Sequence, residues 1–237
     1  MTPTVYCLCP TFRAKPAKLI GNSIACFESQ DYPKDKRFLF IYDDTGYFEP
    51  VSGDNWSLVV DHRREPNLSA KYNKMLSRVS SRDIVLVWDD DDIYLPWHIT
   101  SHVKSLQTSQ WSHPEYCYSL YTGKLELEGT RGLFHGSLGA WRNSIKRVGD
   151  WPDTLRADFD QKMIRKLANQ FGNPGRPEPP SYVFRWGSTK APHTQGFMKS
   201  PDDETWYDQC GKLKAGDSRR VTPAFDEETE TLIRRMA

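Results

Sequence analysis

The chain has 237 residues, enough for one large domain or for a domain with an appendage. Its 32 Lys and Arg residues nearly balance 31 Asp and Glu residues, so no overall field draws the protein to nucleic acid or anionic lipid. We find no apolar run of transmembrane length, no secretory signal and no CxxC pair among the 5 cysteines. We therefore expect a cytoplasmic protein without disulfides or structural zinc.

The first half of the chain alternates strand and helix patterns. In chain order we predict a strand over 5–9, a helix over 17–30, strands over 38–42 and 57–60, a helix over 68–79, a strand over 84–88 and a helix over 96–106. This alternation predicts βαβ units and an α/β fold with a mostly parallel central sheet and helices on both faces.

The second half has a different pattern. We predict half-exposed strands over 116–121 and 124–127, a glycine-rich stretch over 129–139, helices over 141–148 and 158–171, a strand over 181–186 and a terminal amphipathic helix near 226–236. The alternating strands indicate a small antiparallel sheet beside the central one.

Polar side chains follow three of the predicted strands. Thr11 and Arg13 follow the first, Asp43 and Asp44 the second, and four aspartates at 89–92 follow the buried strand at 84–88. Ligands bind at the carboxyl ends of strands in such sheets. Four adjacent carboxylates repel one another unless a cation is bound, and oxygen donors suit Mg²⁺ or Mn²⁺, ions that bind diphosphates. The alternative is a solvated acidic turn that caps the next helix.

Five short motifs occur in order along residues 5–193. They are Cys9-Pro10-Thr11-Phe12-Arg13, Gln30-Asp31-Tyr32-Pro33, Ile41-Tyr42-Asp43-Asp44, Asn73 in its helix, and the acidic run followed by Ile93-Tyr94-Leu95-Pro96. In this order and spacing they resemble glycosyltransferase family 2, inverting enzymes with the GT-A (nucleotide-diphospho-sugar transferase-like) fold. The resemblance implies a nucleotide-sugar-binding half over 1–108, an acceptor-side half over 109–200 and a C-terminal extension over 201–237.

The resemblance also implies which residues contact the nucleotide sugar. These positions are Pro10, Thr11, Arg13, Asp44, Lys71 and Asp90. Asp44 is expected to accept a hydrogen bond from the base, with Asp43 as its structural neighbour. Thr11 could instead cap a helix, and Lys71 could be an ordinary solvated lysine.

Metal ligands follow from the register of the acidic run. Alignment on residues 93–96 implies that Asp89 opens a D-x-D motif, that Asp91 binds Mn²⁺ or Mg²⁺, and that Asp92 serves local capping. His193, after the last strand, is the expected third ligand, and an imidazole favours Mn²⁺. The metal would stabilise charge on the departing nucleoside diphosphate.

An inverting transfer needs a base for the acceptor hydroxyl, and the family supplies an Asp at a helix start. Asp158 and Asp160 are the candidates. Asp160 shares the inward face of its helix with Met163, Ile164 and Leu167, at 100° per residue. We therefore predict Asp160 as the base and Asp158 as the N-cap, although Phe159 replaces the family's usual acid before the base.

The glycine-rich stretch resembles the family's acceptor-side loop, where we expect His135 and Trp141. For both residues packing in the core is the alternative. A sugar nucleotidyltransferase is disfavoured because the first strand lacks a glycine-rich phosphate loop. A non-catalytic carbohydrate-binding or scaffold protein would have lost acids that are present here. The resemblance implies a UDP-sugar as the donor, with GDP- and dTDP-sugars as alternatives. The acceptor could be a glycan, a lipid-linked sugar, a protein, a small molecule or a modified nucleobase. Such a compact chain suits a bacterial, phage or viral origin.

Overall fold

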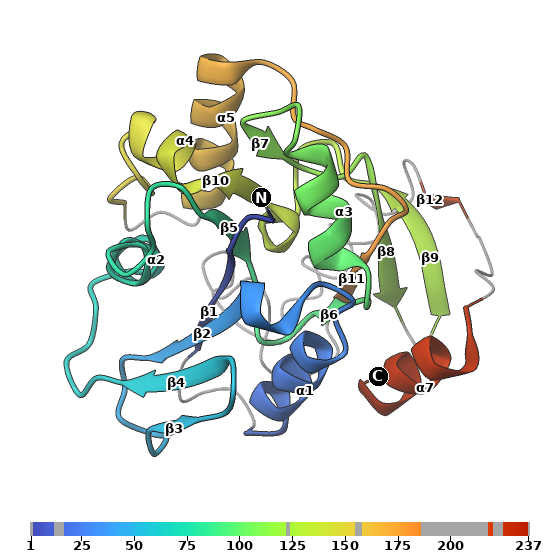
Figure 1. Cartoon of the computed structure of the whole chain (residues 1–237), viewed down its shortest axis with the longest axis horizontal. Helices are drawn as coiled ribbons and strands as arrows, with labels where there is room; N and C mark the ends of the chain where they lie inside the picture. The colour runs from blue at the N-terminus through green and yellow to red at the C-terminus, as the bar shows by residue number, and fades with distance from the viewer. Residues whose placement is uncertain are drawn as a thin grey trace, which may run out of the picture.

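The computed structural model describes residues 2–11, 17–121, 124–154, 158–185, 218–219 and 225–236. A central seven-stranded sheet has the order β3-β4-β2-β1-β5-β10-β7 (Figure 1). Its strands are β1 (Val5–Thr11), β2 (Arg37–Asp43), β3 (Val51–Ser52), β4 (Trp56–Val60), β5 (Ile84–Val87), β7 (Trp111–Ser112) and β10 (Gly139–Trp141). β4, β2, β1 and β5 pair in parallel, whereas β3 and β10 run antiparallel to their neighbours. The predicted α/β class with a mostly parallel central sheet is confirmed.

A second, five-stranded sheet has the order β12-β9-β8-β11-β6. Its strands are β6 (Ile93–Tyr94), β8 (Tyr116–Tyr121), β9 (Lys124–Gly129), β11 (Tyr182–Arg185) and β12 (Ser218–Arg219). β11 runs parallel to β8, while the other pairs are antiparallel. The smaller sheet is therefore mixed, because β11 enters beside β8 after a long connection through the helices of the second half.

Helices cover both faces of the central sheet (Figure 1). They are α1 (Ala17–Glu28), α2 (Leu68–Leu76), α3 (His98–Ser105), α4 (Arg142–Arg147), α5 (Phe159–Phe171) and α7 (Glu227–Met236), with short 3₁₀ helices η1 (Lys34–Lys36) and η2 (His135–Ser137). One hydrophobic cluster joins α1, α3 and α7 to one face of β1 and β5, and a second joins α2, α4 and α5 to the other. Two cores form because successive strand residues point to opposite faces. No helix within the described ranges is long and apolar enough to cross a membrane.

The sequence suggested that the glycine-rich stretch is a loop, but in the structure it does not form one continuous loop. Residues 139–141 form β10, which inserts beside β5 in the central sheet. Gly139 permits this close approach, since an added Cβ would lie 2.6 Å from Ser112 Oγ and 2.7 Å from His102 Nδ1. A strand of three residues is too short to show an alternating pattern, so β10 could not be predicted from periodicity.

Gln30, just after the end of α1, holds the segment that follows the acidic run. Its side-chain amide donates to the Leu95 carbonyl at 2.9 Å, and its Oε1 accepts from the Ile99 amide at 3.0 Å. The Asp31 amide donates to the Pro96 carbonyl at 2.8 Å. The Gln30-Asp31 motif therefore fixes the start of α3 and the exit from the acidic run.

Candidate functional site

The carboxyl ends of β1, β2 and β5 meet at one edge of the central sheet. Thr11, the last residue of β1, lies in register with Asp43 at the end of β2. The Thr11 hydroxyl donates to Asp90 Oδ2 at 2.6 Å, and both residues are buried. This contact joins the end of β1 to the acidic run after β5, two of the three strand ends that carry predicted site residues. Pro10 lies just before it, within β1.

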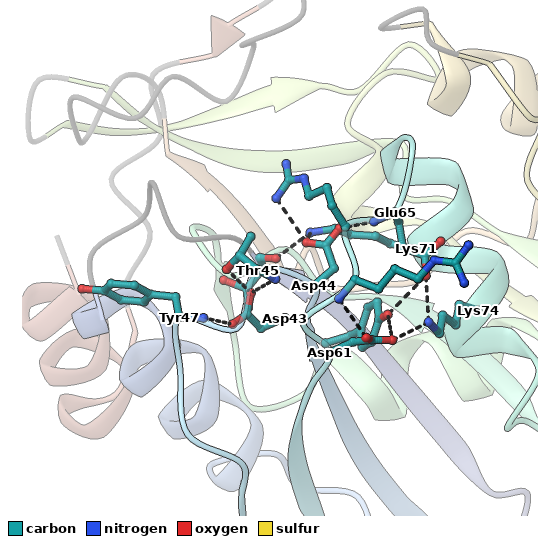
Figure 2. Close-up of polar contacts among 12 residues, drawn as sticks. Asp43, Asp44, Thr45, Tyr47, Asp61, Glu65, Lys71 and Lys74 are labelled. Atoms are coloured by element: carbon teal, nitrogen blue, oxygen red, sulfur yellow. Dashed lines mark hydrogen bonds and ion pairs between the residues drawn. The ribbon is translucent and has the colours of Figure 1, made fainter.

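Lys71, in the first turn of α2, joins the end of β1 to the end of β2. Its ammonium lies 2.5 Å from Asp44 Oδ1 and donates to the Thr11 carbonyl at 2.7 Å. Asp44 Oδ2 accepts from the Glu65 amide at 2.9 Å, and Arg64 lies 3.2 Å from Oδ1 (Figure 2). Burial lowers the pKa of Lys71, and the Asp44 carboxylate opposes that shift. Lys71 is thus a buried member of this network and not a solvated lysine.

Asp43 turns away from Asp44 and shapes the loop that follows β2. Its carboxylate accepts from the amides of Thr45 and Tyr47, each at 2.9 Å, and from the Thr45 hydroxyl at 2.5 Å (Figure 2). This is the structural role predicted for the first of the two adjacent acids. It leaves Asp44 as the acid that contacts the Lys71 network.

The acidic run crosses from β5 in the central sheet to β6 in the second sheet, and tyrosines hold its start. The Tyr72 hydroxyl donates to Asp89 Oδ1 at 3.2 Å. The Asp89 amide donates to the Tyr94 hydroxyl at 2.6 Å, which in turn donates to the Gly136 carbonyl at 3.2 Å. The sequence analysis did not single out Tyr72, because its partner Asp89 lies 17 positions along the chain.

The sequence suggested that Asp92 caps a helix, but the structure shows a different role. It accepts a hydrogen bond from the Tyr182 hydroxyl and another, at 3.1 Å, from the Arg185 amide, both on β11. α3 begins after Trp97 without a side-chain cap. The partners of Asp92 lie 90 and 93 positions further along the chain, so local sequence could not indicate them.

The acidic run offers the donor chemistry of a divalent cation site. Asp90, Asp91 and Asp92 are buried, and burial, followed by the charge of Asp91, raises the pKa of Asp92 to about 8. Closely spaced, buried carboxylates of this kind suit a hard cation. Within the described part of the chain no group of three His, Cys, Asp or Glu side chains is poised to hold a metal. Two predicted residues, His193 and Arg13, lie outside the described residues.

η2 brings His135 to the same edge. An added Cβ on Gly136 would lie 2.7 Å from Asp89 Oδ2, so glycine lets this backbone pack against the acidic run. His135 is buried; its Nε2 accepts from the Trp151 indole at 2.9 Å, and its ring lies 5.3 Å from that of Phe159. Burial, with a smaller effect of another histidine, lowers the pKa of His135 to about 3.

Trp141 does not lie at this edge of the sheet. It pairs with Ile84 at the start of β5, the end of the strand opposite Asp89. Its indole donates to the Leu106 carbonyl at 3.1 Å. This position favours the packing alternative that the sequence left open.

An aromatic contact holds the start of α5 close to the acidic run. Phe159 stacks on Tyr72 with ring centroids 6.4 Å apart, and the Tyr72 hydroxyl donates a hydrogen bond to Asp89. Burial raises the pKa of Asp160, and the Gln161 amide donates to its Oδ1 at 2.6 Å. The inward face of α5 is the predicted one, with buried residues Met163, Ile164 and Leu167.

Asp158 occupies the predicted N-cap position of α5, but its side chain makes no capping hydrogen bond. The carboxylate instead pairs with Lys162 one turn later, at 3.1 Å. About a third of the side chain is exposed, in contrast to the more enclosed Asp160. The two candidate bases therefore differ in environment.

The fold is similar to that of solved structures with bound nucleotide sugars. S. aureus TarS 1–349 with UDP-GlcNAc matches with a TM-score of 0.65 and 14% identity over 99% of this chain and 70% of that one. The mannosyltransferase PcManGT from Pyrobaculum calidifontis, with GDP-Man and Mn²⁺, matches with a TM-score of 0.57 and 17% identity over 100% and 70%. A further crystal structure of S. aureus TarS 1–349 matches with a TM-score of 0.62 and 14% identity over 77% of this chain, which spans only 60% of that one. No family model and no curated protein sequence matches.

Proposed function

We propose that this protein is a metal-dependent, inverting glycosyltransferase of the family 2 type. It would transfer a sugar from a nucleoside-diphosphate sugar, in the first place a UDP-sugar, to an acceptor hydroxyl. The observation that carries the proposal is the joined edge of the sheet, where Thr11, Lys71 and Asp44 link two strand ends and Asp90 links the third. The shared fold with proteins crystallised with UDP-GlcNAc and GDP-Man supports it.

The donor would bind along this edge. Asp44 would contact the base, Pro10 and Thr11 would lie beside it, and Asp90 would face the ribose or sugar. Lys71 holds the Asp44 carboxylate in place through a buried ion pair. Arg13 would reach the ribose or the phosphates.

Asp89 and Asp91 would hold Mg²⁺ or Mn²⁺, with His193 as a third ligand. The bound ion would neutralise the diphosphate as it departs. The tyrosine contacts to Asp89 and the β11 contacts to Asp92 fix this segment, so the donor oxygens would be positioned before substrate arrives.

Asp160 would act as the base. The acceptor oxygen would attack the anomeric carbon as the bond to the diphosphate breaks on the opposite face, and the hydroxyl proton would pass to Asp160. A partly desolvated carboxylate with a raised pKa is a stronger base than an exposed one, which suits this step. Residues 1–108 would bind the donor, residues 109–200 the acceptor, and residues 201–237 would form an extension.

Thermal denaturation with UDP, GDP, dTDP, CDP and ADP, each with and without Mn²⁺, tests the proposal. A ligand of the folded state raises the melting temperature by mass action. We expect one nucleotide to stand out, with Mn²⁺ required, and the Asp91→Asn variant to lose that metal-dependent shift. A flat response to all five nucleotides would contradict the proposal and favour a non-catalytic protein on the same fold.

A further inference from the structure

The hydrogen bond from Trp151 defines the protonation of His135. The indole Nε1–H of Trp151 lies 2.9 Å from Nε2 of His135. An indole nitrogen can only donate, so Nε2 must accept, and the neutral imidazole carries its proton on Nδ1. Burial holds the pKa of His135 near 3, so the ring is uncharged at neutral pH.

The ring is also fixed in position. It meets the ring of Tyr72 edge-on at 5.3 Å and that of Phe159 at 5.3 Å. Tyr72 in turn stacks on Trp151 at 4.8 Å. No hydrogen-bond partner for Nδ1 occurs among the residues that the structure describes. His135 therefore presents one N–H donor that none of the described residues accepts.

Two contacts place His135 between the proposed metal ligands and the proposed base. On one side the next residue, Gly136, packs against the carboxylate of Asp89. On the other side Phe159, which touches the imidazole, directly precedes Asp160. In a displacement at an anomeric carbon, the group between the departing diphosphate and the base is the transferred sugar.

We propose that His135 Nδ1–H donates a hydrogen bond to an oxygen of the transferred sugar and so helps to select the donor. The inference rests on the proposed function. A neutral imidazole in this tautomer can donate but not accept at Nδ1, so it recognises a lone pair on a sugar hydroxyl or acyl oxygen. Trp151 is a positioning residue, since it acts by fixing the tautomer.

The imidazole nitrogens can be observed directly by NMR of ¹⁵N-labelled protein at pH 7. We expect His135 to be neutral with its proton on Nδ1. With Mn²⁺ replaced by Mg²⁺, its Nδ1–H resonance should move on addition of UDP-GlcNAc or GDP-mannose, and much less with UDP or GDP. His98 and His102 are matched internal controls, because they too are buried and neutral but lie in α3, on the other face of the sheet. A charged ring, or a proton on Nε2, would overturn the inference without any ligand.

Two amide substitutions separate sugar binding from packing. The side-chain nitrogen of Asn can occupy the place of Nδ1, whereas the amide of Gln can reach that of Nε2 and accept from Trp151. We expect His135→Gln to weaken nucleotide-sugar binding by about 10-fold while UDP or GDP binding changes little. His135→Asn should recover most of that loss even though Trp151 loses its acceptor. A purely structural histidine predicts the reverse order.

The outcomes also separate this inference from the proposed function. If a nucleotide raises the melting temperature but both variants bind its sugar conjugate as the wild type does, the inference is wrong and the glycosyltransferase proposal stands. If no nucleotide or nucleotide sugar binds, the proposed function is wrong, and the sugar contact is wrong with it.

Discussion

At the scale of single residues, the Lys71–Asp44 pair shows how environment sets the importance of a charge. Both side chains are buried, and Lys71 Nζ lies 2.5 Å from Asp44 Oδ1. Arg64 contacts the same carboxylate at 3.2 Å, but 59% of its side chain is exposed. Removal of one partner of a buried pair leaves an uncompensated charge, whereas an exposed partner is replaced by water.

We therefore expect Lys71→Met to lower the free energy of unfolding by about 3–5 kcal/mol. The matched Arg64→Met variant should lower it by less than about 1 kcal/mol. Urea denaturation at pH 7 measures both values. Equal losses in the two variants would show that the Lys71 site is more hydrated than the structure indicates.

The two candidate bases can be separated in the same way. Asp160→Asn should reduce the turnover number by roughly 10²–10⁴-fold, since the acceptor proton then has no base, but should keep the metal-dependent thermal shift with nucleotide. Asp158→Asn, which weakens the half-exposed ion pair with Lys162, should change turnover by a few-fold at most. Nucleoside diphosphate release from the nucleotide sugar in the presence of acceptor glycans gives the rates. Greater damage from Asp158→Asn would reassign the base.

At the scale of elements, one helix positions the segment that leads into another. Asn73, in the middle of α2, makes two hydrogen bonds with the backbone of Trp151, each 2.9 Å long. Its side-chain amide donates to the Trp151 carbonyl, and its Oδ1 accepts from the Trp151 N–H. The segment after α4 is thereby attached to α2, close to the start of α5. Asn73 is one of the motifs that resemble family 2, and this pair of hydrogen bonds gives that position a physical role.

Asn73→Ala removes both bonds at once. We expect a loss of about 1–3 kcal/mol in unfolding free energy and faster hydrogen exchange at the Trp151 amide. Asn143→Ala, at an exposed position in α4, is the control and should stay within about 0.5 kcal/mol of the wild type. Unchanged exchange at Trp151 in Asn73→Ala would mean that packing alone holds this segment.

At the scale of the whole molecule, buried histidines make the fold sensitive to acid. Burial lowers the pKa of His98 to about 3, of His113 to about 4 and of His135 to about 3, and it also lowers that of His102. An unfolded histidine titrates near 6.5, so below that pH the unfolded chain binds more protons than the folded one. Stability should therefore fall as the pH falls from about 6.5 toward 4. Asp83, Asp92 and Asp160, whose pKa values burial raises, act in the opposite direction but are fewer than the four histidines.

Urea denaturation between pH 7 and pH 4.5 measures this dependence. Each net proton taken up on unfolding changes the slope by about 1.4 kcal/mol per pH unit. We expect His98→Gln to lower the slope by about one proton and the exposed control His62→Gln to leave it unchanged. A wild-type stability that is flat over this range would show that these imidazoles are not buried in the neutral form.

The sequence by itself determined the parts of this protein that depend on local periodicity. The alternation of strands and helices, the inward face of α5 and the polar ends of β1, β2 and β5 could all be predicted, because side-chain direction repeats every 2 residues in a strand and every 3.6 in a helix. The tertiary structure alone decided the partners. Thr11 meets Asp90 across 79 positions and Asp92 meets Tyr182 across 90, and the same holds for the insertion of β10 beside β5. Such contacts leave no periodic trace, since they arise only when the two sheets and both cores have formed.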